Sequence, residues 1–308
     1  MLSFALRRLI RGVLTLWLVV TAIFFALRLS GDPIYLLLGP EASPEAITAM
    51  RNDLGLNDSL PVQYLRYLRS IASGNFGNSI REQRPATTSV LQRLPATAEL
   101  AAASLLLAIL IGIPIGIIAA LHRGSFLDRG LMSLAFIGQS APNFFLGILL
   151  ILLFSLWLRL LPSSGRGGWQ HLIMPTITLS TYGIASLARL TRSSMLEVLG
   201  QEFVRVARAK GLSEMKVQLR HVLRNAAIPV LTIFGIQLGA AISGAVVTET
   251  VFAWPGMGRL ATNAVFNRDY PVIQLIALLI AASVVTINFL VDMLYGWIDP
   301  RIREESRL

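Results

Sequence analysis

The sequence predicts an all-α polytopic membrane protein with six transmembrane helices and one long helical external loop. Four observations predict this class. Mean hydropathy is +0.65, 54% of the residues are hydrophobic, and the apolar residues gather in segments of membrane-spanning length. Charged residues make up 14% of the chain, against about 25% in soluble domains. The chain contains no cysteine, which excludes disulfides and thiolate metal sites.

Six apolar segments approach the roughly 20 residues that a helix needs to cross a bilayer. The first is too long for a signal-peptide core and lacks a small-residue cleavage site after it, so we expect a retained span. The fourth is the most polar, because it carries several threonine and serine residues. The predicted spans are Leu9–Leu29, Ala98–Leu121, Leu131–Leu158, Leu172–Leu190, Ile228–Phe252 and Val272–Ile298.

The spans divide the chain into four regions. Residues 1–29 hold the N-terminal end and first span, 30–97 an external region, 98–298 a five-span core with a loop at 191–227, and 299–308 a tail. An even number of spans places both termini on one side. That side holds more Lys and Arg outside the spans than the other, so the termini and the 191–227 loop are predicted to be cytoplasmic. Because these cations are scattered between apolar segments, no nucleic-acid partner is expected.

Proline and glycine mark two short helices in the external region. Pro44 begins the first, which ends before Gly55, and Pro61 begins the second, which ends before Gly74. The second carries an apolar stripe at helical spacing and is expected to pack on the membrane-facing bundle. The stripe consists of Tyr64, Leu65, Leu68, Ile71 and Ala72.

Small residues four positions apart predict close helix packing in two spans. Prolines inside spans, at Pro114 and Pro142, predict local kinks. The small-residue pairs are Gly112 with Gly116 and Gly235 with Gly239.

Ionisable residues inside a membrane are functional candidates by default. Glu249 and Asp292 fall within predicted spans, each near an end, where snorkelling or pairing is the alternative. The small face of the fifth span is either a packing surface or the lining of a passage. The candidate translocation-path residues are Gln237, Ser243, Thr248 and Glu249.

A basic, helix-forming insert separates the fourth and fifth spans. It contains both lysines of the chain, Lys210 and Lys216, and must face water. Residues from Glu202 to Lys210 favour a helix, Gly211 supplies a left-handed stop, and Ser213 can cap a second helix. Two short helices joined by a small elbow suit docking into a groove on another protein. Resting on anionic lipid headgroups is the alternative.

Motifs for catalysis are not found. The phosphate-binding pattern G-x-x-x-x-G-K-[ST] is missing, so the chain is not expected to hydrolyse ATP by that route. His122, His171 and His221 fall on different loops, so no shared metal site is expected. A membrane enzyme would need converging His or carboxylate pairs, and a channel or secondary transporter a charged midplane pathway or matching broken halves.

Short motifs occur in a fixed order along nearly the whole chain. They are Ser30-Gly-Asp-Pro33, Leu54-Gly-Leu56, Leu60-Pro-Val-Gln-Tyr64, Gly74-Asn-Phe-Gly77, Ala207-Arg-Ala-Lys-Gly-Leu212, His221 to Pro229, Glu249-Thr-Val-Phe-Ala-Trp-Pro-Gly256, Arg268-Asp-Tyr-Pro271 and Asp299-Pro-Arg301. In this order they resemble the B-type permease subunit of ABC importers of the dipeptide/oligopeptide/nickel/glutathione family. One departure is that Arg205-Val-Ala207 stands where the general coupling motif of such permeases has Glu-Ala-Ala.

The resemblance implies a type I ABC importer permease fold and a transport role in the bacterial inner membrane. The chain would form half of the pathway of an ATP-driven, binding-protein-dependent importer of di- or oligopeptides; nickel chelates, glutathione or another small solute are alternatives. Implied partners are a second homologous permease, two ABC ATPase subunits that carry ATP and Mg, an external substrate-binding protein, and membrane lipid. No cofactor is expected on this chain.

The resemblance also assigns two sets of contact residues. The ATPase-coupling candidates, centred on the elbow, are Arg205, Ala207, Arg208, Lys210, Gly211, Leu212 and Ser213. The candidates for contact with the binding protein are Asp32, Trp254, Arg268 and Asp269.

Overall fold

The computed structural model describes residues 2–29, 34, 38, 42–53 and 55–298. These residues are mostly helical, and the strand-type pairing among them is one isolated bridge between Asn78 and Pro85. The chain divides into two compact units, one of Met1–Pro95 with Gly256–Leu308 and the other of Ala96–Pro255. The prediction of an all-helical fold is confirmed.

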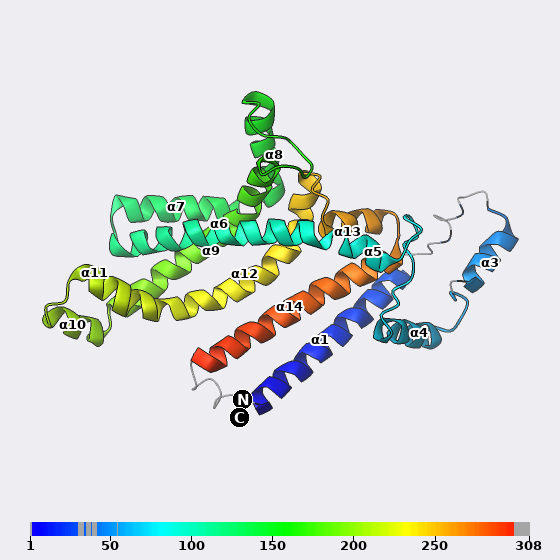
Figure 1. Ribbon diagram of the computed structural model, residues 1–308, viewed down its shortest axis with the longest axis horizontal. Coiled ribbons are helices and arrows are strands. Elements are labelled where there is room, and N and C mark those ends of the chain that lie inside the picture. The colour runs from blue at the N-terminus through cyan, green and yellow to red at the C-terminus, as the bar shows by residue number, and fades with distance from the viewer. Residues whose placement is uncertain (1, 30–33, 35–37, 39–41, 54, 299–308) are drawn as a thin grey trace. The chain divides into compact units, whose positions relative to one another are not determined.

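Two long apolar helices that lie side by side form the base of the first unit (Figure 1). They are α1 (Leu2–Leu29) and α14 (Tyr270–Ile298). Each is long and apolar enough to cross a membrane, as predicted for the first and last spans. Arg8 Nη1 and Asp292 Oδ2 lie 2.8 Å apart and join the two helices, so Asp292 is paired.

Four shorter helices complete the described part of the first unit. The two predicted in the external region are present as α3 (Pro44–Asp53) and α4 (Leu60–Ala72). Two others, α5 (Ala86–Leu91) and α13 (Met257–Phe266), were not predicted.

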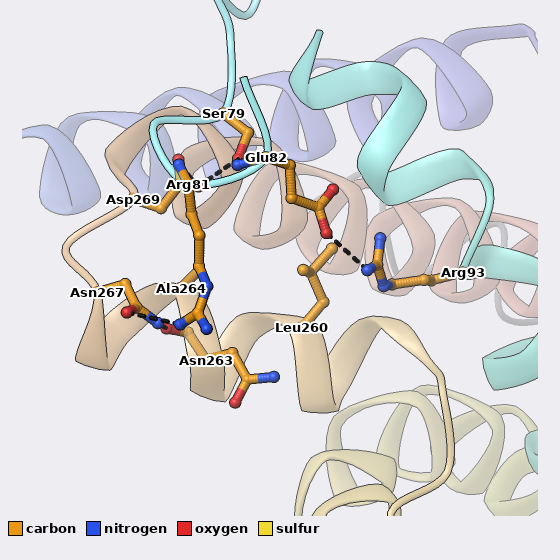
Figure 2. A pocket seen from close by; sticks show the side chains of 9 residues that line it. All are labelled: Ser79, Arg81, Glu82, Arg93, Leu260, Asn263, Ala264, Asn267 and Asp269. Atoms are coloured by element: carbon orange, nitrogen blue, oxygen red, sulfur yellow. Dashed lines mark hydrogen bonds and ion pairs between the residues drawn. The ribbon is translucent and has the colours of Figure 1, made fainter. Parts of the chain in front are cut away.

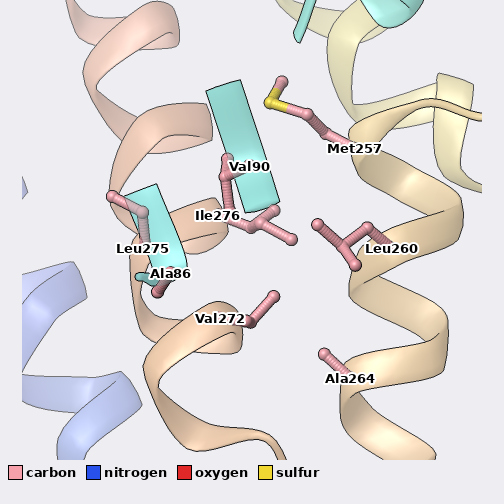
Figure 3. Close-up of a cluster of buried hydrophobic side chains, with 8 residues drawn as sticks. All are labelled: Ala86, Val90, Met257, Leu260, Ala264, Val272, Leu275 and Ile276. Carbon is pink, nitrogen blue, oxygen red and sulfur yellow. The ribbon is translucent and has the colours of Figure 1, made fainter. Parts of the chain in front are cut away.

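Helices α5, α13 and the start of α14 share a hydrophobic core (Figure 3). Val90 of α5 and Ile276 of α14 are both buried in it. Met257, Leu260 and Ala264 of α13 face the same core at three- and four-residue spacings, as expected of an amphipathic helix. Helix α13, in the segment between the fifth and sixth predicted spans, therefore forms because it buries one face.

Helix α4 packs on α1, but the prediction of its contact face was only partly correct. The rings of Tyr64 and Tyr67 lie against Phe24, with centroids 5.3 and 5.5 Å apart. Leu65 is 65% exposed and Ala72 is also exposed. The aromatic side chains set the rotation of the helix, which turns part of the predicted stripe outward.

The second unit contains the remaining long helices. It includes most of α6 (Leu94–Leu121), then α7 (Phe126–Ser140), α8 (Asn143–Leu150), the π-helical segment η1 (Ile151–Trp157) and α9 (Gln170–Leu199). The insert follows as α10 (Glu202–Ala209), α11 (Glu214–Lys216) and the π-helical segment η2 (Val217–Val222), which runs into α12 (Leu223–Val251). Helix α9 lies against both α7 and α12 (Figure 1).

The predicted close packing at Gly112 and Gly116 is confirmed. A methyl group on Gly112 would lie 2.8 Å from the carbonyl oxygen of Ile184, and one on Gly116 would lie 2.5 Å from that of Ala188. The α6 backbone therefore contacts the α9 backbone directly, which only glycine permits. The second pair stays a prediction, because the side-chain surroundings of Gly235 lie outside the described residues.

The prediction of a single helix for the third span is wrong. Helices α7 and α8 meet at a bend of 101°, and Ala141 between them is extended, with φ −74° and ψ 129°. Pro142 is the cause, because a proline disfavours the helical conformation of the residue before it and has no N–H to donate. The mild kink expected at Pro142 is thus a complete break, whereas Pro114 stays within the continuous helix α6.

The predicted fourth span is the beginning of a longer helix. Helix α9 has 30 residues and continues to Leu199, past the predicted start of the loop at residue 191. Within the described residues, α1, a segment covering Ala86–Leu121, and α14 are apolar enough to span a membrane, and the bent α7–α8 pair could make a fourth. Helix α9 is more polar because it turns hydroxyl groups inward: Thr178 is buried and donates to the carbonyl of Met174 at 2.9 Å.

Candidate coupling surface and transport-path residues

Helix α10 ends in a tight elbow, as the sequence predicts. Gly211 has φ +77°, a conformation that suits glycine. Its N–H donates to the carbonyl of Arg208 at 2.9 Å, and the N–H of Leu212 donates to the carbonyl of Ala207 at 3.4 Å. This pair of bonds is the Schellman motif, which stops a helix and folds the next apolar residue back onto it.

One face of α10 is anchored inside the protein. Val204 and Ala207 are buried in a cluster with Val217 and Val222 of the following helix and Met195 of α9. The methyl group of Ala207 therefore faces its own chain. Its spacing from Val204 places both residues on the inner side of the helix, so Ala207 anchors α10, and its part in ATPase coupling stays a prediction.

The opposite face of α10 is exposed. Arg205, Val206 and Ala209 lie on it, and Val206 is 51% exposed. Lys210, Gly211 and Ser213 are exposed in the elbow, and Leu212 is half-buried against the anchoring cluster. Val206 was not predicted as a contact residue, although its position two residues from Val204 signals an outward apolar side chain. The surface thus has an apolar centre and a basic rim.

An ion pair closes the elbow. Arg208 Nε and Nη2 donate to the two carboxylate oxygens of Glu214 at 2.7 and 3.2 Å, across the turn at Gly211. Both side chains are exposed, so the pair contributes about 0–1 kcal/mol. Ser213 occupies the N-cap position of α11, but its side chain makes no capping hydrogen bond. The predicted role of Ser213 as a side-chain cap is therefore wrong.

A second ion pair, not predicted, fastens α7 to α9. Arg192 Nε and Nη2 donate to Asp128 Oδ1 and Oδ2 at 2.7 and 2.8 Å. Asp128 also accepts the N–H of Gly124 at 2.9 Å and is 2% exposed. The bidentate geometry compensates a buried carboxylate. Sequence spacing could not reveal it, because the partners are 64 residues apart.

The predicted path residue Glu249 is buried inside the second unit. Its side chain is 0% exposed and accepts a hydrogen bond from Thr97 Oγ1 of α6 at 2.6 Å. Trp254 lies close by, and its backbone N–H donates to the carbonyl of Glu249 at 2.8 Å. The carboxylate of Glu249 faces α6 in this structure, and a transport role for this residue stays a prediction.

Two other predicted path residues are also enclosed. Thr248 and Gln237 are buried, and within the described part of the chain Thr248 Oγ1 and Gln237 Nε2 have no hydrogen-bond partner. Ser243 lies outside the residues whose side chains are described. A transport role for these polar groups stays a prediction.

Two of the residues predicted to contact a binding protein are buried as well. Trp254 is 1% exposed and its Nε1 donates to the carbonyl of Ala96 at 2.8 Å. Asp269 is 3% exposed and accepts hydrogen bonds from Ser79 Oγ at 2.5 Å and the N–H of Ile80 at 3.1 Å. Trp254 thus ties its loop to α6, and Asp269 ties its loop to Ser79 and Ile80. Contact of either residue with a binding protein stays a prediction.

The other two residues predicted to contact a binding protein are Arg268 and Asp32. Arg268 is half-buried with φ +47°, a strained conformation for a residue with a side chain. Asp32 lies outside the described residues.

A hollow of about 180 Å³ lies beside Asp269 (Figure 2). Arg81 extends across it and donates to Asn267 Oδ1 at 2.7 Å, and Arg93 pairs with Glu82 at 2.7 Å. Burial alone would raise the pKa of Glu82, but hydrogen bonds from Ser89, Arg84 and Arg93 outweigh it and hold the pKa at about 2. Among the described residues, no group of three His, Asp or Glu side chains could hold a metal ion.

Comparison with known families covers almost the entire chain. Residues 112–304 match the inner membrane component of binding-protein-dependent transport systems, and residues 1–101 match the N-terminal region of such membrane components. The chain belongs to this permease family. It is therefore a membrane subunit of an ABC importer and an inner-membrane component, and the family implies ATPase and substrate-binding partners.

Relatives of this permease are named for the transport of glutathione or of peptides. It is 44% identical to the glutathione transport system permease protein GsiC of Salmonella paratyphi A, over 98% of this chain and 99% of that protein. It is 42% identical to the di/tripeptide transport system permease protein DppB of Pseudomonas aeruginosa, over 99% and 100%. A probable peptide ABC transporter permease of Sinorhizobium fredii, y4tP, is 42% identical over 97% and 99%.

Solved structures support the fold of this permease. The inward-facing methionine ABC transporter MetNI matches with a TM-score of 0.57 at 20% identity, over 68% of this chain and 96% of that chain. An amino acid ABC transporter matches with a TM-score of 0.52 at 16% identity, over 68% and 93%. The predicted type I ABC importer permease fold is thereby confirmed.

Proposed function

We propose that this permease forms one half of the translocation pathway of an ATP-driven importer of di- or oligopeptides, and that α10 receives the movement of an ATPase subunit. A second homologous permease would supply the other half, and each of two ABC ATPases would engage one permease. ATP and Mg would bind to the ATPases. Rocking of the two halves would then expose the path alternately to each side of the membrane.

The observation that carries this proposal is the two-sided construction of α10. Its inner face is buried through Val204 and Ala207, while its outer face presents Arg205, Val206 and Ala209. A helix anchored in this way moves with its own protein when a partner pushes on the exposed side. The elbow at Gly211 leads through α11 and η2 directly into α12, and π-helical turns often occur at functional positions.

The proposed orientation places both termini and α10 in the cytoplasm. The excess of Lys and Arg on that side supports it. The external substrate-binding protein would then approach the side that carries α3 and α4.

The proposed substrate class rests on the relatives. Two are named for peptides and one for glutathione, which is itself a modified tripeptide. Glutathione is therefore the second candidate, favoured by the GsiC match at 44% identity. ATPase stimulation of the reconstituted importer by a dipeptide or by glutathione, each with the binding protein present, distinguishes the two.

Single cysteines test both docking and orientation, because the native chain has none. Val206→Cys lies on the outer face of α10, and Ala49→Cys on α3 is a matched exposed control. A benzophenone attached at position 206 should crosslink to an ATPase subunit in the assembled importer, whereas one at position 49 should not. A membrane-impermeant maleimide added to spheroplasts should label position 49 and leave position 206 unlabelled.

Two results would overturn the proposal. Failure of position 206 to crosslink in an importer that still hydrolyses ATP would remove α10 from the ATPase interface. Labelling of position 206 from outside intact spheroplasts would reverse the orientation.

A further inference from the structure

Helix α4 presents an outward face that is both apolar and basic. Val62 is 45% exposed and Leu65 is 65% exposed. Arg66 and Arg69 lie on the same side of the helix and are also exposed. An apolar face left in contact with solvent marks a surface that another phase or partner covers.

The position of α4 along α1 indicates which phase or partner covers its outward face. Tyr64 Oη lies 2.6 Å from Thr21 Oγ1, and Arg28 Nε donates to Gln63 Oε1 at 2.8 Å. Thr21 precedes the end of α1 by eight residues, which is about 12 Å along a helix axis. The apolar segment of α1 runs to Leu29, so α4 sits alongside the last third of a core about 30 Å thick and the headgroup layer beyond it.

The surface of α1 next to α4 is itself exposed. Phe25 is 45% exposed, and its ring stacks with that of Tyr64 at a centroid distance of 6.2 Å. Only 11% of the most apolar window of α1 is buried inside the protein. The outward face of α4 therefore continues a surface that belongs to a membrane span. Tyr64 and Tyr67 beside Phe24 place amphipathic rings where membrane proteins commonly have them, at the bilayer interface.

We propose that α4 lies flat in the lipid interface at this end of α1. Val62 and Leu65 enter the boundary of the acyl chains. The aliphatic stems of Arg66 and Arg69 lie along the acyl chains, and their guanidinium groups reach the phosphates. Arg66 also pairs with Asp58 at 2.6 Å, which holds its guanidinium at the edge of the apolar face of α4. The basic charge favours an anionic phospholipid surface.

This inference depends on α1 crossing the membrane, not on the substrate, the ATPase partners or the side on which the termini lie. It can therefore fail while the proposed transport function stands, and the reverse also holds.

Spin labels on single cysteines in the assembled importer test the inference. The protein is reconstituted into vesicles of phosphatidylethanolamine and phosphatidylglycerol, with Leu65→Cys on α4 and Ala49→Cys on α3 as the water-exposed control. Collision rates are measured with oxygen, which concentrates in lipid, and with a water-soluble nickel chelate. We expect oxygen to dominate at position 65 and the nickel chelate to dominate at position 49. Repeating the measurement at Val62→Cys and Gln63→Cys should show the higher oxygen rate at position 62.

Three results would overturn the inference. Dominance of the nickel chelate at position 65 would place the face in water. Protection at position 65 that appears only after the binding protein is added would assign the face to that protein. Low collision rates with both reagents would show that protein, and not lipid, covers it.

Discussion

Replacing Gly116 by alanine should push α6 and α9 apart. The new methyl carbon would lie 2.5 Å from the carbonyl oxygen of Ala188 and 2.6 Å from Thr191 Cβ, where ordinary contact begins at 3.4 Å. The helices would have to separate by most of that 0.9 Å shortfall. Overpacking of this kind lowers the free energy of unfolding by about 1–3 kcal/mol. The upper part of this range applies because the carbonyl oxygen of Ala188 belongs to the backbone and cannot rotate away. The better helix propensity of alanine offsets roughly 1 kcal/mol of this loss of stability.

Gly130→Ala is the matched control, because Gly130 also lies within a helix but has nothing within 4 Å of the added methyl group. It should raise the free energy of unfolding by about 0.5–1 kcal/mol through propensity alone. Equilibrium unfolding in mixed micelles, followed by tryptophan fluorescence, measures both variants. Gly116→Ala should fall about 2–3 kcal/mol below the control. A Gly116→Ala protein as stable as Gly130→Ala would refute the direct backbone contact between α6 and α9.

Three further predictions concern polar groups that are buried or half-buried. Asp128→Asn should lower the free energy of unfolding by about 1–3 kcal/mol in the same assay, because it leaves Arg192 without its bidentate carboxylate; an unchanged value would contradict this. Trp254→Phe should cost about 0.5–1.5 kcal/mol by removing the hydrogen bond from Trp254 Nε1 to the carbonyl of Ala96, and equal stability would show that the bond is dispensable. The pKa of Glu82 falls from 4.5 to about 2 on folding, so its contribution is complete above pH 4.5 and is lost as the pH falls towards 2. Protease sensitivity of the segment 78–93, which includes α5, should rise over this range in the wild type more than in Glu82→Gln, and parallel pH profiles would disprove it.

Local rules predicted the features that depend on neighbouring residues. The stop at Gly211 follows from glycine at a helix end, and the contact at Gly116 follows from small residues four positions apart. The predicted spans for α1 and α14 likewise needed only the length and apolarity of one segment.

The contacts that the sequence did not reveal depend on partners far along the chain. Trp254 and Asp269 look like exposed loop residues in the sequence, yet each is buried by hydrogen bonds to segments 158 and 190 residues away. Glu249 was assigned to a passage because intramembrane carboxylates are commonly functional. Its partner Thr97 is 152 residues away, and only the packing of α12 on α6 reveals the pair. Ala207 was placed on the docking surface because the family motif includes it, whereas its side chain anchors the helix.

In the proposed importer, the outer face of α10 transmits the work of an ATPase to this permease. Val206→Asp tests it most directly, with Val206→Ala as the matched control and reconstituted uptake and ATPase affinity as the measurements. Burying an unpaired carboxylate in that contact should cost at least about 2 kcal/mol, or roughly a 30-fold loss of ATPase affinity, and should abolish uptake while Val206→Ala remains close to wild type. Wild-type affinity and uptake in Val206→Asp would contradict the claim.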